Sequence, residues 1–509
     1  MSFNAVGTSP LQIVACCRFS TKHGHTSIVQ WIQHSTPIDV LDDDSLLNIF
    51  CLYRPPLLDG KEIHAIRIIW GSKWNRERWW YKLTHICRRW RHLILGSASY
   101  LGLCLLCAPG TPIADMLARS PQFPIVIDIF HLDNGDRMNA NDVEGIILAL
   151  EHRDRVRRIR LWTPSSVTEK VIAHIDGEFP TLEYLCIAPM YRTDILFPET
   201  FQAPQLRHLI SVNFACPMRS PLLSPTMGLV TLSLLNVPPP FFQPSELLHR
   251  VSLIPQLEIL WIGWDVIYPR HWVDPHVDNA THISLPNLRF LQFRGFNAFL
   301  EALLSRITAP HLEVVRIAFW EERTFSVPCL LQFMSTLGDL RLGSATLSFD
   351  GNGATLSVYP YKTVKRSVFD MFIEGTPGSK VSNAAQVLNA LSPLFSSVVD
   401  LTLDYEDNRF SPQMRNEDEP TDWRVILRSF NNVKNLFVAK GVVRKLSRSL
   451  RADDGESINN LLTELKELTY YRYDNPDAFT GFIDARQNAG HPVTLVHPKN
   501  TISIRRVFL

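Results

Sequence analysis

The chain has 509 residues, of which 46% are hydrophobic and 20% charged, and its formal net charge at pH 7 is +1. This composition is that of an ordinary globular protein and excludes a disordered or collagen-like chain. A net charge so close to zero argues against a long-range field that would steer nucleic acid to the protein. No apolar run approaches the roughly 18 residues that a membrane span needs, so we expect no membrane segment.

The nine cysteines have no regular spacing, which indicates a reducing compartment, the cytoplasm or the nucleus, rather than a disulfide scaffold. Residues 1–36 contain Arg18 and Lys22 but no acidic residue. We expect a disordered tail there, with a transit peptide as the alternative.

The stretch "IDVLDDDSLLNIFCLYR", which begins at Ile38, predicts a first helix. The aspartates at 42–44 stand at its start, where one can cap free backbone N–H groups and all favour the helix dipole. Apolar residues then follow at the spacing of one helix face, namely Leu46, Ile49, Phe50 and Tyr53. Pro55 and Pro56 end the pattern.

The stretch "KWNRERWWYKLTHICRRWRHLILGSASYLGLCLL", Lys73 to Leu106, predicts a second helix. Its basic and aromatic letters fit either nucleic-acid binding or an amphipathic helix. The apolar stripe consists of Leu83, Ile86, Cys87, Trp90 and Ile94. Three arginines, Arg88, Arg89 and Arg91, fall off this stripe. We therefore favour a helix that ends at Gly96 with its arginines in solvent, and we expect no nucleic-acid partner.

These two helices resemble the F-box of mushroom-type fungal F-box proteins. "LDDDSLLNIF" is similar to the opening of that module, and "CRRWRHLI" is similar to its later Cys-Arg-x-Trp-Arg signature. Two departures stand out: Asp42 replaces the usual proline, and an insertion at about 53–80 separates the halves. The resemblance implies an F-box-like helical module over 37–108, which docks the Skp adaptor and through it a cullin–RING ubiquitin ligase.

Matching positions carry over a set of candidate adaptor-contact and module-core residues. They are Leu41, Leu46, Ile49, Phe50, Cys87, Trp90, Leu93 and Leu101. A module of two or three short helices cannot bury all of these side chains by itself, so a partner is expected. The alternative is that they pack against the C-terminal part of the same chain.

From residue 154 onward one pattern recurs, in which apolar residues stand at the first, fourth and sixth places, except that Ser211 holds the sixth place of the third unit. It begins at Val156, Leu182, Leu206, Leu229, Leu257, Leu288, Leu312, Leu337, Val398, Val433 and Leu465. The last three places alternate as in a half-buried strand, and segments such as "NAFLEALLSRI" between the units have helical spacing. A strand plus a helix every 20–30 residues is typical of a leucine-rich repeat.

We therefore predict an α/β fold, in which the helical module is followed by an irregular leucine-rich-repeat-like solenoid, or horseshoe, with a parallel sheet. The solenoid would occupy 154–509, after a linking or capping segment at 109–153. The gap of 61 residues between Leu337 and Val398 indicates an irregular unit. A doubly wound α/β domain is the alternative, but the phosphate loop or switch-point glycines that it requires are missing from the sequence.

Residues between the buried places of each strand would lie on the concave face of such a solenoid. The middle of this face is aromatic and cationic, and its end is acidic. The candidate target-binding residues are Trp261, Phe290, Gln292, Arg294, Arg316 and Arg341. The alternative is a solvated sheet surface with scattered arginines, because a shift of one residue in register rearranges the set.

The sequence contains none of the catalytic or phosphate-binding motifs H-E-x-x-H, G-x-S-x-G and the Walker loop. Cys104 and Cys107 have C-x-x-C spacing without a second pair, which favours buried thiols over a metal. "DGNGATL" at Asp350 predicts a hairpin turn rather than a phosphate loop. We expect no catalytic residue, no metal and no cofactor.

The resulting hypothesis is a substrate-recognition adaptor of an SCF-type (Skp–cullin–F-box) ubiquitin ligase that captures an unknown target protein and is not an enzyme. The alternative hypothesis is a non-catalytic protein-interaction scaffold that does not deliver targets to ubiquitin.

Overall fold

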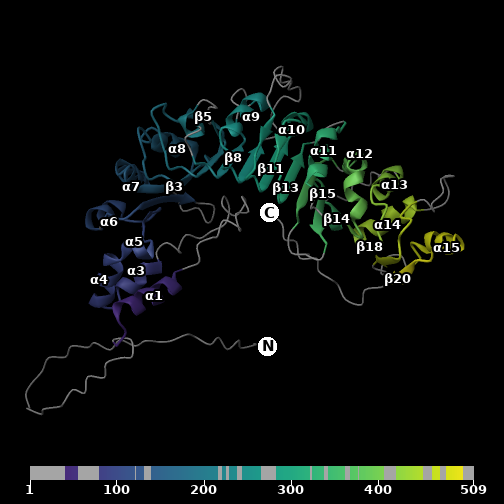
Figure 1. The fold of residues 1–509 in the computed structure, drawn as a ribbon, viewed down its shortest axis with the longest axis horizontal. Coiled ribbons are helices and arrows are strands. Elements are labelled where there is room, and N and C mark those ends of the chain that lie inside the picture. The colour runs from purple at the N-terminus through teal and green to yellow at the C-terminus, as the bar shows by residue number, and fades with distance from the viewer. Residues whose placement is uncertain are drawn as a thin grey trace, which may run out of the picture. The chain divides into compact units, whose positions relative to one another are not determined.

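The computed structural model describes residues 40–54, 79–120, 122–130, 139–215, 220–224, 228–237, 243–264, 282–320, 324–337, 342–361, 367–376, 378–405, 420–450, 461–470 and 477–496 (Figure 1). The chain divides into two compact units, Met1–Tyr53 and Arg54–Leu509. The expected tail at 1–36, most of the 53–80 insertion and Arg341 lie outside the described residues.

The first unit contains helix α1 (Asp43–Tyr53). Asp42 begins it as the sequence predicted, because its carboxylate Oδ1 accepts a hydrogen bond of 2.6 Å from the backbone N–H of Ser45. Asp43 and Asp44 occupy the first turn, where the helix dipole favours negative charge. The helix ends two residues before Pro55, in agreement with the predicted boundary.

The second unit begins with three short helices, α3 (Trp79–Thr84), α4 (Arg88–Gly96) and α5 (Ala98–Leu101). The sequence predicted one helix across α3 and α4, and this prediction was wrong. Cys87 has an extended backbone, with φ −153° and ψ 170°, and its Sγ accepts the N–H of Trp90. Cys87 is therefore the N-cap of a new helix, and the apolar spacing continues across the break without showing it.

A sheet of sixteen strands dominates the described part of the second unit. In spatial order these are β1 (Leu105–Cys107), β2 (Ile125–Phe130), β3 (Val156–Trp162), β4 (Tyr184–Ile187), β6 (His208–Val212), β8 (Thr231–Leu235), β9 (Ile259–Gly263), β11 (Phe290–Gly295), β13 (Val314–Phe319), β16 (Phe369–Glu374), β15 (Gly353–Pro360), β14 (Leu342–Phe349), β17 (Asp400–Tyr405), β18 (Asn435–Val438), β19 (Glu467–Tyr470) and β20 (Thr494–Val496). Most neighbouring pairs are parallel, as between β11 and β13.

The predicted repeat units coincide with strands, except for the unit at Leu337. There Leu337 follows a helix, residues 338–341 lie outside the described part, and β14 begins at Leu342. The segment 109–153, expected to link or cap, contributes the strand β2 to the same sheet.

The irregular unit predicted in the 61-residue gap consists of β14, β15 and β16. β14 and β15 form the antiparallel hairpin predicted at Asp350, whose Oδ1 accepts the N–H groups of Asn352 and Gly353. β15 is also antiparallel to β16, which in turn pairs with β13. The expectation of a wholly parallel sheet was therefore wrong here, and the sheet is mostly parallel.

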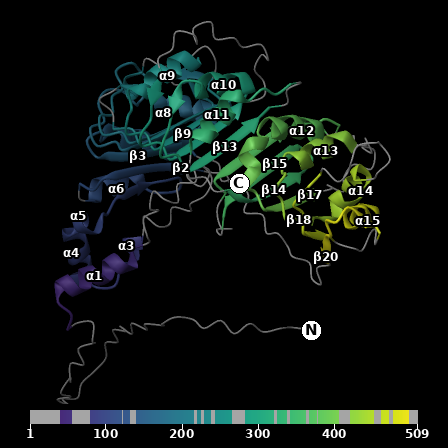
Figure 2. The same ribbon diagram turned by 45° about the vertical axis from the view of Figure 1, so that its right-hand side comes forward.

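Helices connect the strands and lie along one side of the sheet in both views (Figures 1 and 2). They are α6 (Ile113–Arg119), α7 (Ala140–Glu151), α8 (Ser165–Ile172), α9 (Pro244–Ser252), α10 (Asn297–Leu304), α11 (Pro328–Thr336), α12 (Lys380–Ala390), α13 (Pro420–Arg428), α14 (Lys440–Ser449) and α15 (Thr480–Asn488). The described part of the unit also contains two short 3₁₀ helices, η3 (Pro221–Leu223) and η5 (Ser392–Ser397). Two small parallel sheets pair β5 (Thr193–Leu196) with β7 (Phe214–Ala215) and β10 (Ile283–Ser284) with β12 (Ile307–Thr308). No helix within the described ranges is both long and apolar enough to cross a membrane.

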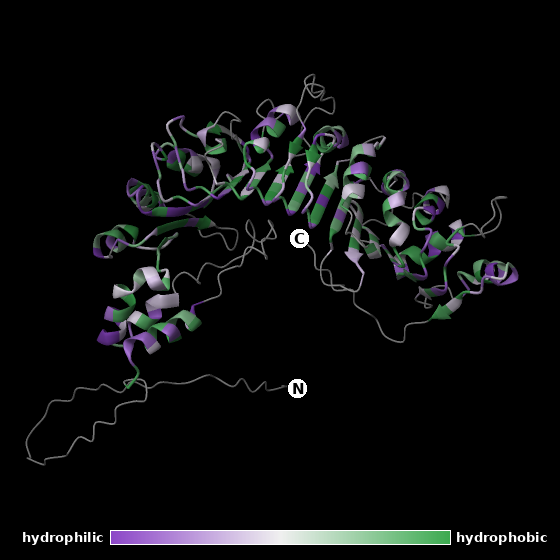
Figure 3. Cartoon of the chain, in the orientation of Figure 1, coloured by the Kyte–Doolittle hydropathy of each residue, from purple (hydrophilic) through white to green (hydrophobic). Residues whose placement is uncertain are grey.

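Alternate residues of each strand form the main core. On the helix side, Leu232, Leu260 and Leu291 are cross-strand neighbours that are at most 3% exposed. Hydrophobic and hydrophilic bands alternate along the central strands (Figure 3). The architecture is leucine-rich-repeat-like, because each strand–helix unit covers the apolar side chains of its neighbours.

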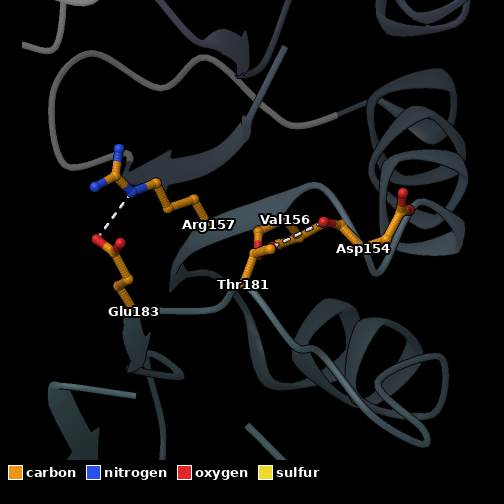
Figure 4. Close-up of polar contacts among 5 residues, drawn as sticks. All are labelled: Asp154, Val156, Arg157, Thr181 and Glu183. Atoms are coloured by element: carbon orange, nitrogen blue, oxygen red, sulfur yellow. Dashed lines mark hydrogen bonds and ion pairs between the residues drawn. The ribbon is translucent and has the colours of Figure 1, made fainter. Parts of the chain in front are cut away.

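Polar contacts between successive units align β3 and β4 at the N-terminal ends of these strands. The Thr181 hydroxyl donates to the carbonyls of Asp154 and Val156, both at 3.1 Å (Figure 4). Arg157 and Glu183, which hold the second places of two consecutive units, form an ion pair of 2.8 Å (Figure 4). Both residues are partly exposed, so we attribute alignment rather than much stability to this pair.

Candidate functional site

We call the side of the sheet opposite the helices the open face. Its central row consists of Ser233, Trp261, Gln292, Arg316 and Asp370, which are direct cross-strand partners on β8, β9, β11, β13 and β16. Because side chains alternate along a strand, all five lie on this face. The structure thus brings together three predicted target-binding residues in one row.

The predicted residues differ in how much of each side chain solvent reaches. Trp261 and Phe290 are only 7% and 4% exposed, in a hydrophobic cluster with Cys186, Ile210 and Val314. Gln292 and Arg316 are half-buried, whereas Arg294 is exposed. Arg341 lies outside the described residues. On the open face of β11 and β13, a partner would therefore meet arginine and glutamine before the aromatic rings.

The two arginines of this region have different charge environments. The Nε of Arg316 lies 3.3 Å from Oδ2 of Asp370, and its guanidinium lies 5.5 Å from the ring centre of Phe290. Arg294 stacks on the ring of Trp320 at 4.5 Å. Within the described part of the chain, no carboxylate lies within ion-pair distance of Arg294, so its charge is not neutralised there.

Several polar atoms of the central row and of Trp320 are buried and make no hydrogen bond to described residues. They are Ser233 Oγ, Trp261 Nε1, Gln292 Oε1 and Trp320 Nε1. A buried polar group without a partner costs roughly 1–3 kcal/mol, so such atoms call for an explanation such as a ligand or a bound water.

A second polar cluster lies on the open face of β2, β3 and β4. The guanidinium of Arg160 donates two hydrogen bonds, of 2.7 and 2.9 Å, to the carboxylate of Asp128. Both side chains are at most 5% exposed. Burial raises the pKa of Tyr184 well above its usual value and raises the pKa of Cys186 to about 12. The Cys186 thiol therefore stays protonated at neutral pH and is a poor nucleophile.

His208 lies beside this cluster. Its Nδ1 is 3.0 Å from the Thr231 hydroxyl, and the His208 ring contacts the Tyr184 ring. Burial, together with the charges of Arg158 and Arg207, lowers the pKa of His208 to about 4. The imidazole is therefore neutral at physiological pH and does not titrate near pH 7.

The predicted adaptor-binding residues of α1 divide into two groups. Leu46 and Phe50 are buried, at 0% and 1% exposure, and Leu41 is half-buried. Ile49 is 41% exposed, and Leu52, which the motif did not mark, is 86% exposed. Leu46 and Phe50 are therefore buried, while Ile49 and Leu52 present apolar surface.

The remaining adaptor candidates lie on α4, at its N-cap and on α5 of the second unit. Leu101 is buried, Trp90 and Leu93 are half-buried, and Cys87 is exposed. Nearby Ile86 is 57% exposed, although the predicted stripe placed it inside. Arg88, Arg89 and Arg91 are exposed, as the amphipathic interpretation predicted.

Two features that orient the repeats escaped the sequence prediction. Asn213 and Asn236 each follow a strand in the left-handed backbone region, with φ 53° and 54°. The Asn236 amide donates to Oδ1 of Asn213, and the Asn213 amide donates to the Pro189 carbonyl. The sequence could have indicated this feature, because both asparagines directly follow the predicted strand of their unit.

The other missed feature is Glu301 of α10. Its two carboxylate oxygens accept the backbone N–H groups of Cys329 and Leu330, at 2.6 and 3.0 Å, in the first turn of α11. Burial raises the pKa of this carboxyl. The cap comes from the preceding helix, 28 residues away, so it has no local motif.

The described part of the chain contains no group of three or more His, Cys, Asp or Glu side chains that could hold a metal ion. Cys107 is buried in β1 and Cys104 is half-buried just before it.

No family model matches the chain, and no curated protein matches it. A crystal structure of a TLR13–ssRNA13 complex is 14% identical over 77% of this chain and 48% of the other, with a TM-score of 0.30. The leucine-rich repeat-containing protein LegL7 from Legionella pneumophila is 10% identical over 77% of this chain and 99% of the other, with a TM-score of 0.25. The chain thus spans about half the length of the first of these structures.

Proposed function

We propose that the protein is a non-catalytic protein-interaction adaptor, and specifically the substrate-recognition subunit of an SCF-type ubiquitin ligase. The observation that carries this proposal is the apolar surface of α1, where Ile49 and Leu52 are exposed on the same helix as the buried Leu46 and Phe50. Leaving such a side chain in water forfeits roughly 1.5–3 kcal/mol relative to burying it, which favours a covering partner.

The resemblance of this segment to an F-box supports the choice of partner. The Skp adaptor would cover the exposed apolar side chains of α1, Ile49 and Leu52. The adaptor would connect the protein to a cullin–RING ligase in the cytoplasm or the nucleus.

The repeat region would supply the target-binding half of this function. A leucine-rich-repeat-like sheet offers a long row of side chains of mixed chemistry on its open face, which suits recognition of another protein. Holding a target beside a ubiquitin-charged enzyme raises its effective concentration, so the adaptor itself needs no catalytic group.

A protein-interaction scaffold without ubiquitin delivery remains the alternative function. It is favoured by the departures from the F-box pattern, Asp42 in place of proline and the inserted 53–80 segment. The two functions differ in one partner, because only the ligase adaptor brings a cullin into the complex.

Co-expression of the full chain with a Skp adaptor tests the proposal. A soluble complex of one copy each, which also retains a cullin in a pull-down, is the expected result. A complex without the cullin would favour the scaffold, and failure to form any complex would exclude the F-box function.

A matched pair of variants locates the contact. Ile49→Asp places a charge on α1 and should weaken the complex at least about tenfold, because the charge must be desolvated. Met190→Asp is the control, since Met190 is 42% exposed, as Ile49 is, but lies in the repeat region. Equal affinity of the two variants would remove α1 from the interface.

A further inference from the structure

The guanidinium of Arg294 is held in a fixed orientation by its stacking on Trp320. Its guanidinium rests on the Trp320 ring at 4.5 Å, and Trp320 is only 4% exposed, so the ring is a fixed support. The Arg294 side chain is exposed at the open face. A guanidinium that is held in place but not neutralised by described residues is suited to bind an oxyanion through two parallel hydrogen bonds.

The neighbouring charges determine which oxyanion fits. Arg316 is already paired with Asp370 at 3.3 Å, so these two side chains together are neutral. Among the described residues around this position, Arg294 therefore leaves one positive charge to balance. A carboxylate carries one negative charge, whereas a phosphate monoester carries about −1.5 to −2 at pH 7 and would place excess negative charge near Asp370. The charge count favours a carboxylate.

The row that contains Arg294 indicates what lies beside the carboxylate. Val212, Leu235, Gly263 and Arg294 are consecutive cross-strand partners on β6, β8, β9 and β11. Val212 and Leu235 are half-buried against the hydrophobic cluster of the open face. Gly263 allows Leu235 and Arg294 to approach, since a Cβ there would meet a Leu235 methyl group at 3.0 Å and the Arg294 Cβ at 3.4 Å.

The spacing of the strands sets the spacing of the ligand. β8 and β11 are two strands apart, which is about 10 Å, and an extended peptide crosses that distance in about three residues. The buried polar atoms Gln292 Oε1 and Trp320 Nε1, which lack partners among the described residues, come from the same strand as Arg294 and from its stacking partner. The backbone of a crossing peptide carries both donors and acceptors that such atoms require.

We propose that Arg294 binds the carboxylate of an Asp or Glu in an extended segment of the target, whose apolar side chain about three residues away packs on Leu235. This inference rests on the proposed function, since it names the class of segment that the target-binding half recognises. It does not depend on the Skp adaptor, so the two can fail separately.

Selection from a random dodecapeptide library displayed on phage tests this inference with the purified full chain. Peptides retained by the wild type, after removal of those retained by Arg294→Gln, should be enriched in Asp or Glu with a large apolar residue about three positions away. Absence of enrichment, or enrichment without an acidic residue, overturns the proposal.

Synthetic versions of one selected peptide then define the contact. Replacing its acidic residue by Gln or Asn should weaken binding at least about tenfold, the loss expected for a charge-assisted hydrogen bond. Arg294→Gln should show the same loss, whereas Arg289→Gln should not, because Arg289 is exposed on the same strand unit but pairs with Glu313. Tighter binding of a phosphoserine version would overturn the carboxylate assignment, and unchanged binding to Arg294→Gln would overturn the site.

Discussion

At the scale of single residues, the open face of β2, β3 and β4 is polar, but its side chains are unreactive at neutral pH. Arg160 and Asp128 neutralise each other through two hydrogen bonds, and the Cys186 thiol has its pKa raised to about 12 by burial. A buried pair of this kind costs several kcal/mol when one partner is removed, so it holds the strands to one register rather than adding net stability.

His208 gives this region a dependence on pH. Its pKa is lowered to about 4 in the folded protein, against about 6.5 for an unperturbed histidine. Below about pH 6.5 the His208 imidazole is therefore protonated in the unfolded chain, whereas in the folded protein it is protonated only below about pH 4. As the pH is lowered from about 6.5 to about 4, the free energy of unfolding should therefore fall by up to about 1.4 kcal/mol per pH unit.

The His208→Gln variant should lack this contribution. Urea unfolding from pH 7.5 to pH 4.5 should show a wild-type stability that falls more steeply with acidification than that of the variant. Parallel profiles for the two proteins would mean that His208 is not the group responsible.

At the scale of elements, α10 and α11 are joined by a cap that crosses from one unit to the next. Glu301 accepts two backbone N–H groups of the first turn of α11, whose Pro328 stands at the first helical position and has no N–H of its own. The carboxylate also lies at the positive end of the α11 dipole.

Glu301→Ala removes this cap and should lower the free energy of unfolding by about 1–2 kcal/mol, the usual cost of an N-cap loss. The loss is measured by chemical denaturation, with Glu313→Ala as the control. Glu313 is 58% exposed and forms only a surface ion pair, so its replacement should cost less than about 0.5 kcal/mol. Similar losses in both variants would contradict the capping role.

The elements also show how far sequence reasoning reached. The strands of the sixteen-stranded sheet from β3 to β13 were predictable, because Ile159, Leu209 and Leu291 each belong to a recurring apolar alternation that is typical of a strand. The short strands of the two small sheets were not predicted. The break between α3 and α4 was not predictable, because the new helix that Cys87 caps continues the same apolar spacing. The register of the open face was predictable, but the burial of Trp261 and Phe290 depends on side chains of several units and has no local signal.

At the scale of the whole molecule, the large sheet of the second unit is a linear array in which each inner strand pairs with its two neighbours. Stability in such arrays is a sum over units and their interfaces, so a local defect unfolds local units. Leu436 lies in β18 and is 1% exposed, which makes it a suitable site for a defect.

Leu436→Ala should cost about 2–5 kcal/mol through loss of contacts and the cavity left behind. Hydrogen exchange followed by mass spectrometry should show faster exchange in β17, β18 and β19, and unchanged exchange in β3 to β8. A uniform rise across all strands would show that the array unfolds as one cooperative block.

The reversed order of β14, β15 and β16 has a consequence for biosynthesis. β13 receives its second neighbour only when β16 has left the ribosome, because β14, the next strand to emerge, pairs instead with β15 and β17. The nascent chain therefore cannot extend the sheet strand by strand past Phe319. It must hold β13 with an open edge while some fifty further residues are translated. A chaperone that shields exposed strand edges would therefore act at this stage more than during synthesis of the consecutive parallel strands, because unpaired strand edges promote aggregation of nascent chains.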